Sequence, residues 1–185
     1  MSGRIAEALL VLPLMLLTTS AQARDWQVDA AKSSLTFKCS YAGEAFDGKF
    51  GKFTAQIAYD EADLASAKFD VNVDLASADT QNSDRDEALA GADFFDSAKT
   101  PPAHFVTQAF ARAADGNVEA RGTLTIRGQS RPVTLKVHFV ASGDSASLDV
   151  DTTLKRLDFG LGTSSDWNDI GKDVPVHGHL VLSPK

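Results

Sequence analysis

The chain has 185 residues, of which 23% are charged, with a net charge of −7 at pH 7 and a single cysteine. No cluster of Lys and Arg accompanies this acidic balance, which argues against nucleic acid as a partner and against electrostatic attachment to anionic lipid headgroups. One cysteine cannot form an internal disulfide, so the fold must be stabilised by an apolar core.

The first 23 residues have the pattern of a cleaved secretory signal peptide. Residues 1–4 carry the amino terminus and one Arg, residues 8–17 form a short apolar run, and residues 21–23 read Ala-Gln-Ala, a small-x-small cleavage site. Spanning a bilayer takes about 20 apolar residues, so this run is too short for a membrane anchor. The sequence predicts an exported mature chain that begins at Arg24 and contains no membrane span.

Most of the mature chain alternates apolar and polar residues with a period of two, which is typical of half-buried β-strands. A phase slip near Gly51 predicts a β-bulge of the kind that bends a strand around a barrel. The strongest element is residues 118–139, where two long alternating arms flank a short polar turn and predict one long hairpin. The predicted extended segments are residues 26–28, 35–41, 46–50, 53–59, 69–75, 103–105, 118–126, 133–139, 148–154 and 174–182, which make up about eight or nine strands.

The alternation stops between Thr80 and Pro101. Acidic residues early in this segment and apolar residues later predict one or two turns of capped helix. The adjacent Phe94 and Phe95 need something large to pack against, which a barrel mouth would provide. The segment is interpreted either as a lid beside a cavity or as an ordinary plug of the barrel end.

The sequence resembles the YceI-like family in blocks that follow the family's order. These blocks are Trp26 to Phe37, Gly48 to Phe53, Leu75 to Thr80, Arg85 to Leu89, Asp93 to Asp96, Gly122 to Leu135 and Arg156 to Gly162. The resemblance implies that residues 24–185 form one periplasmic, lipocalin-like domain that binds polyisoprenoid lipids. Residues 166–174 resemble the branch of the family associated with membrane cytochrome b561, which implies such a cytochrome as a partner.

The predicted fold is therefore all-β: a closed antiparallel eight-stranded lipocalin-like barrel with one or two short helices near a mouth. Large and small inward residues alternate, which predicts an elongated apolar tunnel for a polyprenyl quinone or a similar isoprenoid. The predicted ligand-binding residues are Phe37, Phe50, Phe69, Val71, Phe94, Phe95, Phe105, Leu124, Ile126, Val137, Phe139 and Phe159.

Neither a catalytic site nor a cofactor or metal site is predicted. His177 and His179 share one strand face that we expect to meet solvent, and two ligands do not make a metal site. Cys39 is interpreted as a small buried hydrophobe in preference to a redox thiol. The cluster of Arg156, Asp158, Asp166 and Asp169 is interpreted as a solvated loop with local ion pairs in preference to a clamp for a ligand head group. Two alternatives to a lipid carrier stay open: a small hydrolase or metal-dependent enzyme, and an interaction partner of a membrane cytochrome that carries no ligand.

Overall fold

The structure is a computed structural model that describes residues 23–185; the predicted signal peptide lies almost entirely outside the described residues. The strands are β1 (Arg24–Val28), β2 (Ser34–Tyr41), β3 (Glu44–Phe50), β4 (Phe53–Tyr59), β5 (Lys68–Val73), β6 (Ala78–Asp79), β7 (Ala103–Arg112), β8 (Val118–Ile126), β9 (Gln129–Ser142), β10 (Ser145–Lys155) and β11 (Asp173–Pro184). Residues 23–185 also contain one α-helix, α1 (Ser83–Ala90), and the short 3-10 helices η1 (Leu75–Ser77), η2 (Arg156–Phe159) and η3 (Ser165–Trp167).

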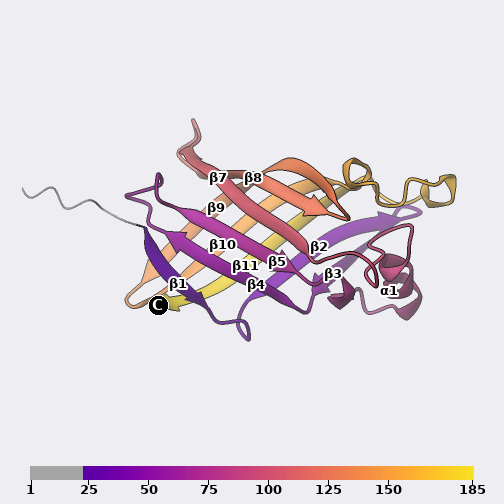
Figure 1. Ribbon diagram of the computed structural model, residues 1–185, viewed down its shortest axis with the longest axis horizontal. Coiled ribbons are helices and arrows are strands. Elements are labelled where there is room, and N and C mark those ends of the chain that lie inside the picture. Colours follow the sequence, from indigo (N-terminus) through magenta and orange to yellow (C-terminus); the bar gives the residue numbers. More distant parts are fainter. Residues whose placement is uncertain (1–22) are drawn as a thin grey trace, which may run out of the picture.

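The strands close into a barrel. Antiparallel pairing runs through β1, β4, β5, β7, β8, β9, β10 and β11, and β11 then pairs with β1, so that the ring has no free edge. Strands β2 and β3 lengthen the barrel wall at one end. Strand β2 pairs with the part of β11 that lies beyond the end of β1, and β3, which pairs with β2, is followed directly by β4. The prediction of a closed antiparallel eight-stranded barrel is confirmed (Figure 1).

The interruption at Gly51 is larger than the predicted bulge. Strand β3 ends at Phe50 and β4 begins at Phe53, while the Gly51 N–H donates to the Ser77 carbonyl oxygen at 2.9 Å. The break allows β4 to pair with β5 while β3 pairs with the short strand β6. The two parts of this interrupted strand, β3 and β4, therefore pair with two different strands, β6 and β5.

The long hairpin predicted from the sequence is present as β8 and β9. Its two-residue turn consists of Arg127 (φ 49°) and Gly128 (φ 74°). Positive φ at both central positions matches a type I′ turn, whose twist suits the right-handed twist of the two strands. Within β8, Gly122 makes room for a neighbouring ring, since a Cβ atom there would lie 2.8 Å from the Phe105 side chain and would overlap the Val106 carbonyl oxygen.

The barrel interior contains two separate apolar clusters. We call the first the filled half; it consists of Trp26, Ile57, Tyr59, Phe69, Val118, Ala120, Val137, Ala146, Leu148, Leu180 and Leu182, with Phe110 and Phe139 packed against it. Its rings contact one another closely, with Phe69 and Phe110 edge to face at 4.8 Å and Tyr59 and Phe139 at 5.0 Å. This aromatic packing leaves Tyr59, Phe69, Leu148 and Leu182 less than 2% exposed and fills that part of the barrel.

The Tyr59 hydroxyl is buried in this cluster without a hydrogen-bond partner among the described residues. Burial raises the pKa of Tyr59 to about 12, so the phenol is neutral at physiological pH. The Trp26 indole, by contrast, donates to the Tyr59 carbonyl oxygen at 2.9 Å and ties β1 to the end of β4.

The second apolar cluster lies at the other end of the barrel, where the chain leaves the strand pattern. Figure 1 shows α1 and the loop after β10 gathered at this end, away from the C-terminus. The cluster consists of Leu75, Phe94, Phe95, Ala103, Ile126, Phe159 and Leu161. We call this end the cavity half, since the space described next lies inside it.

Candidate functional site: an apolar cavity under a lid

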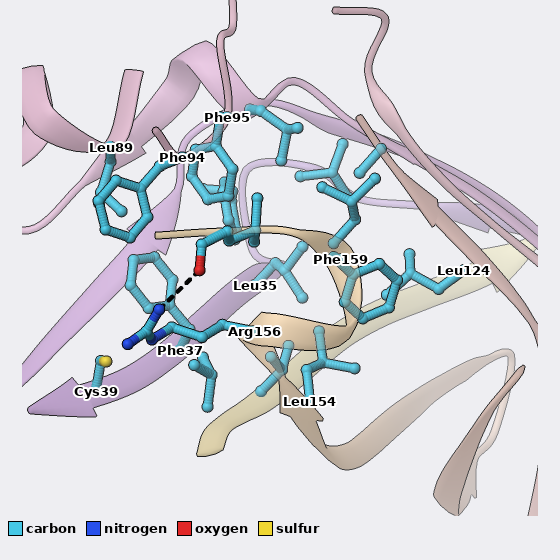
Figure 2. Close-up of a pocket in the computed structure, with 18 of the residues that line it drawn as sticks. Leu35, Phe37, Cys39, Leu89, Phe94, Phe95, Leu124, Leu154, Arg156 and Phe159 are labelled. Carbon is cyan, nitrogen blue, oxygen red and sulfur yellow. Dashed lines mark hydrogen bonds between the residues drawn. The ribbon is translucent and has the colours of Figure 1, made fainter. Parts of the chain in front are cut away.

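A cavity of about 580 Å³ lies inside the cavity half of the barrel. Its wall is formed by inward side chains of β2, β3, β5, β7, β8, β9, β10 and β11, together with α1 and the loop after β10. Figure 2 shows Leu35, Phe37, Leu124, Leu154 and Phe159 converging on this space. A volume of this size is in the usual range for small-molecule sites in proteins, which is about 300–1,000 Å³.

Nine of the twelve predicted ligand-binding residues lie on the cavity wall: Phe37, Phe50, Val71, Phe94, Phe95, Phe105, Leu124, Ile126 and Phe159. The other three, Phe69, Val137 and Phe139, belong to the filled half. The expected tunnel past Phe69 and Phe139 is therefore absent, because these rings pack against Tyr59, Phe110 and Trp26 and occupy the space themselves. The cavity is a blind pocket in one half of the barrel.

The segment predicted as a lid or plug, residues 82–102, covers the cavity, and we call it the lid segment. Its helix α1 begins after Asn82, whose side chain accepts a hydrogen bond from the Arg85 N–H at 3.0 Å. Phe94 and Phe95 are 4% and 8% exposed, and both line the cavity. The cavity beneath these rings favours the interpretation as a lid over that as an ordinary plug.

Two hydrogen bonds hold the lid segment against the loop after β10. The Trp167 indole N–H donates to Asp93 Oδ2 at 3.0 Å, and the Gly162 N–H donates to the Asp93 carbonyl oxygen at 2.6 Å. The Trp167 ring also lies edge to face against Phe94, with centroids 5.0 Å apart. The lid is thus attached to a loop that is itself ordered by a buried arginine.

That arginine is Arg156, and the prediction that it lies in a solvated loop is wrong. It is 5% exposed and donates from all three guanidinium nitrogens to five backbone carbonyl oxygens. These acceptors belong to Leu161 (2.7 Å), Gly162 (2.6 Å), Trp167 (2.9 Å), Ile170 (3.1 Å) and Gly171 (3.0 Å). A guanidinium has five N–H donors, so this loop uses its whole donor capacity. Burial lowers the pKa of Arg156.

Cys39 points inward, as predicted, and lies on the cavity wall close to Arg156 (Figure 2). It is only half-buried, and its thiol makes long contacts of 3.7 Å with the carbonyl oxygens of Ser40 and Gly171. Burial raises the pKa of the Cys39 thiol, which keeps it in the unreactive protonated form at neutral pH.

His177 and His179 lie on the outer face of β11 and are partly exposed. Their Nδ1 atoms lie 2.9 Å from Asp151 Oδ1 and 2.7 Å from Asp149 Oδ1, respectively. The carboxylates come from the neighbouring strand β10, a cross-strand pairing that the β11 sequence alone does not reveal. None of the four histidines lies on the cavity wall.

Several wall residues were not predicted. The apolar ones are Leu35, Tyr41, Phe46, Val73, Leu75, Ala88, Leu89, Ala103, Val133, Leu135, Val150, Leu154, Leu161, Trp167, Ile170, Val174 and Val176. Most of them continue the inward phase of their strands, so the period-two pattern could have identified them. The polar residues at the start of α1, Asn82, Asp84 and Arg85, could not be assigned to the wall from a sequence pattern, because their position depends on where the helix packs against the barrel.

Across residues 23–185, no helix is long and apolar enough to cross a membrane.

Comparisons with known proteins agree with this architecture. Residues 26–182 match the family model described as the YceI-like domain. A UPF0312 protein of Vibrio cholerae serotype O1 is 30% identical over 168 residues, which cover 86% of this chain and 89% of the relative. A UPF0312 protein of Shewanella denitrificans is 32% identical over 156 residues, which cover 80% of this chain and 82% of the relative.

Two solved structures share the fold. The crystal structure of BcnA from Burkholderia cenocepacia is 32% identical and has a TM-score of 0.79, covering 84% of this chain and 99% of that protein. A polyisoprenoid binding domain from Saccharophagus degradans, implicated in plant cell wall breakdown, is 18% identical and has a TM-score of 0.66. The match covers 89% of this chain and 100% of that domain. At 18% identity the second likeness establishes the barrel alone.

Proposed function

The chain belongs to the YceI-like family, and from that premise we propose that it is an exported, non-catalytic carrier that holds one long isoprenoid chain in its cavity. The observation that carries this proposal is the blind apolar cavity of about 580 Å³ under the lid segment. The Saccharophagus degradans protein of the same fold is a polyisoprenoid binding domain, which supports the same ligand class.

Burial of hydrocarbon alone gives sufficient affinity for a carrier. Each buried CH₂ contributes about 0.8 kcal/mol, so one isoprene unit contributes roughly 3 kcal/mol. Micromolar binding requires about 8 kcal/mol after the cost of ordering the ligand, which amounts to about 4 kcal/mol or more. Four isoprene units contribute roughly 12 kcal/mol, which meets this requirement when the ordering cost is about 4 kcal/mol, and a polyprenyl quinone supplies them.

Non-catalytic carriage is consistent with the polar groups on the cavity wall. The N–H groups of Arg156 donate to backbone carbonyl oxygens, and the Cys39 thiol is protonated. Neither group is arranged as a nucleophile beside a general base, which hydrolysis by a side chain would require.

Location and partner form part of the same proposal. The leader pattern in residues 1–23 supports export to the periplasm, and the resemblance of residues 166–174 to the cytochrome b561 branch supports a membrane cytochrome as the partner. A carrier in that compartment would exchange a quinone with such a cytochrome.

The direct test is to purify the protein from the periplasm of its own cells and identify the extracted lipid by mass spectrometry. We expect a single class of polyprenyl compound at close to one molecule per chain. A protein that emerges without lipid, and that does not take up diphenylhexatriene, a fluorescent pure hydrocarbon, would overturn the carrier proposal. Specific retention by the cytochrome without any lipid would then support the alternative of a ligand-free partner.

If the lid segment controls access, Asp93→Ala should accelerate ligand exchange. The substitution removes the acceptor of the Trp167 indole, and losing a hydrogen bond worth about 1 kcal/mol should raise both the on-rate and the off-rate about fivefold. The equilibrium affinity should change much less, because the cavity wall is untouched. Stopped-flow transfer of diphenylhexatriene between protein and lipid vesicles measures both rates.

Asp93→Asn is the matched control, since its side-chain oxygen still accepts the indole N–H. It should exchange at close to the wild-type rate. Equal rates for Asp93→Ala and wild type would mean that the lid segment does not control access to the cavity.

A further inference from the structure

The polar edge of the cavity lies on the first turn of α1. Asn82, Asp84 and Arg85 reach the cavity there, whereas most of the wall is apolar. A long apolar chain that fills the cavity must leave its polar end at an edge where water or polar side chains can solvate it. The side chains of this edge are therefore the candidates for contacts with a head group.

Arg85 is held in place from two sides. Its guanidinium carbon lies 4.0 Å from the centroid of the Phe46 ring on β3, a cation–π contact. Its Nε atom donates to Thr80 Oγ1 at 2.9 Å, and Nη2 donates to the Thr80 carbonyl oxygen at 3.3 Å. Thr80 is 5% exposed, and its hydroxyl in turn donates to Asp86 Oδ1 at 2.6 Å. The guanidinium is thus oriented before any ligand arrives.

This anchoring leaves part of the guanidinium free. Among residues 23–185, Nη1 of Arg85 has no hydrogen-bond acceptor, and no carboxylate lies within 4.0 Å of its nitrogens. Arg156, the other arginine on the cavity wall, instead uses both Nη1 donors on the carbonyl oxygens of Leu161 and Gly162. An oriented, half-buried cation with unused donors at the edge of an apolar cavity is suited to bind an oxygen acceptor.

We propose that Arg85 is the head-group residue of the carrier and donates from Nη1 to an oxygen atom on the polar end of the bound chain. The inference rests on the proposed function, since it assumes an apolar chain in the cavity. The acceptor is either a carbonyl oxygen, as on a prenyl quinone, or a phosphate oxygen, as on a prenyl phosphate. Both are acceptors that a guanidinium can bind, and a hydrocarbon without oxygen offers none.

The test compares three ligands of equal chain length: a prenyl benzoquinone, a prenyl phosphate and the corresponding headless hydrocarbon. Each displaces diphenylhexatriene from wild-type protein and from Arg85→Leu. A charge-assisted hydrogen bond predicts that Arg85→Leu weakens the binding of the headed ligand about tenfold or more. The affinity for the hydrocarbon should stay within about twofold. Whichever headed ligand suffers the larger loss identifies the natural head group.

Two control variants separate recognition from folding. Arg131→Leu makes the same chemical change on the β8–β9 hairpin, where, among residues 23–185, the side chain bonds to Ser130 and Gln129 alone. This variant should bind all three ligands as wild type does. Arg85→Gln keeps a donor that can reach Thr80 but removes the charge. It should fold like wild type and still bind the headed ligand more weakly.

An equal loss for headed and headless ligands would overturn the proposal, because it would assign Arg85 a purely structural role beside Phe46 and Thr80. Unchanged binding of both headed ligands would also overturn it. Failure of the carrier proposal is distinguishable from either result, since the wild-type protein would then bind neither diphenylhexatriene nor the hydrocarbon.

Discussion

Arg156→Met should lower the free energy of unfolding by about 3–5 kcal/mol and should abolish lipid binding. The substitution removes the guanidinium from five carbonyl oxygens, of which, among the described residues, only that of Trp167 keeps another N–H donor, from Ile170. Each buried carbonyl left unsatisfied costs about 1–3 kcal/mol unless the loop opens to water. Opening of the loop would release Trp167 from Phe94 and remove the support of the lid segment. Urea denaturation, with the midpoint compared at constant slope, measures the effect on stability.

Arg127→Met is the matched control, because it makes the same change at the same end of the barrel. The Arg127 side chain donates from Nη1 to the Phe94 carbonyl oxygen at 2.6 Å, with a longer contact to Gly160 at 3.5 Å. Its removal should cost about 1 kcal/mol. The loss of stability in Arg156→Lys should lie between those of Arg156→Met and Arg127→Met, because a lysine has three N–H donors and an arginine has five. If Arg156→Met were no less stable than Arg127→Met, the carbonyl cluster would not be what orders this loop.

Filling the cavity should abolish ligand binding while leaving the fold intact. Val71 on β5 and Val176 on β11 both line the cavity, and the double variant Val71→Phe with Val176→Phe places two rings in its volume. We expect the affinity for diphenylhexatriene and for isoprenoids to fall more than about a hundredfold, since burying even two isoprene units contributes roughly 6 kcal/mol. Stability should be unchanged or higher, because the added rings bury apolar surface in existing space.

Val140→Phe is the control for this experiment. Val140 is 46% exposed on β9, so a ring there adds apolar area without entering the cavity. It should bind ligand like wild type. Native affinity in the filled double variant would place the ligand outside the cavity and would contradict the carrier proposal.

The features that local sequence determined are those set by neighbours in the chain. The side chains of a strand alternate between its faces whatever surrounds it, so the inward residues of β2 and β8 could be assigned from the sequence. The Arg127–Gly128 turn and the Asn82 cap are likewise short-range, since backbone conformation and a side chain three residues away specify them.

What only the tertiary structure decided is where the inward side chains fill the barrel and where they leave space. Phe69 and Phe105 both point inward, but Phe69 meets Tyr59 and Phe110 from other strands, whereas Phe105 lines a cavity. Arg156 looks solvated in the sequence, because its five acceptors converge only when the loop folds around it. Facing direction is a property of one strand, while packing density and the satisfaction of a buried charge depend on groups brought together from distant parts of the chain.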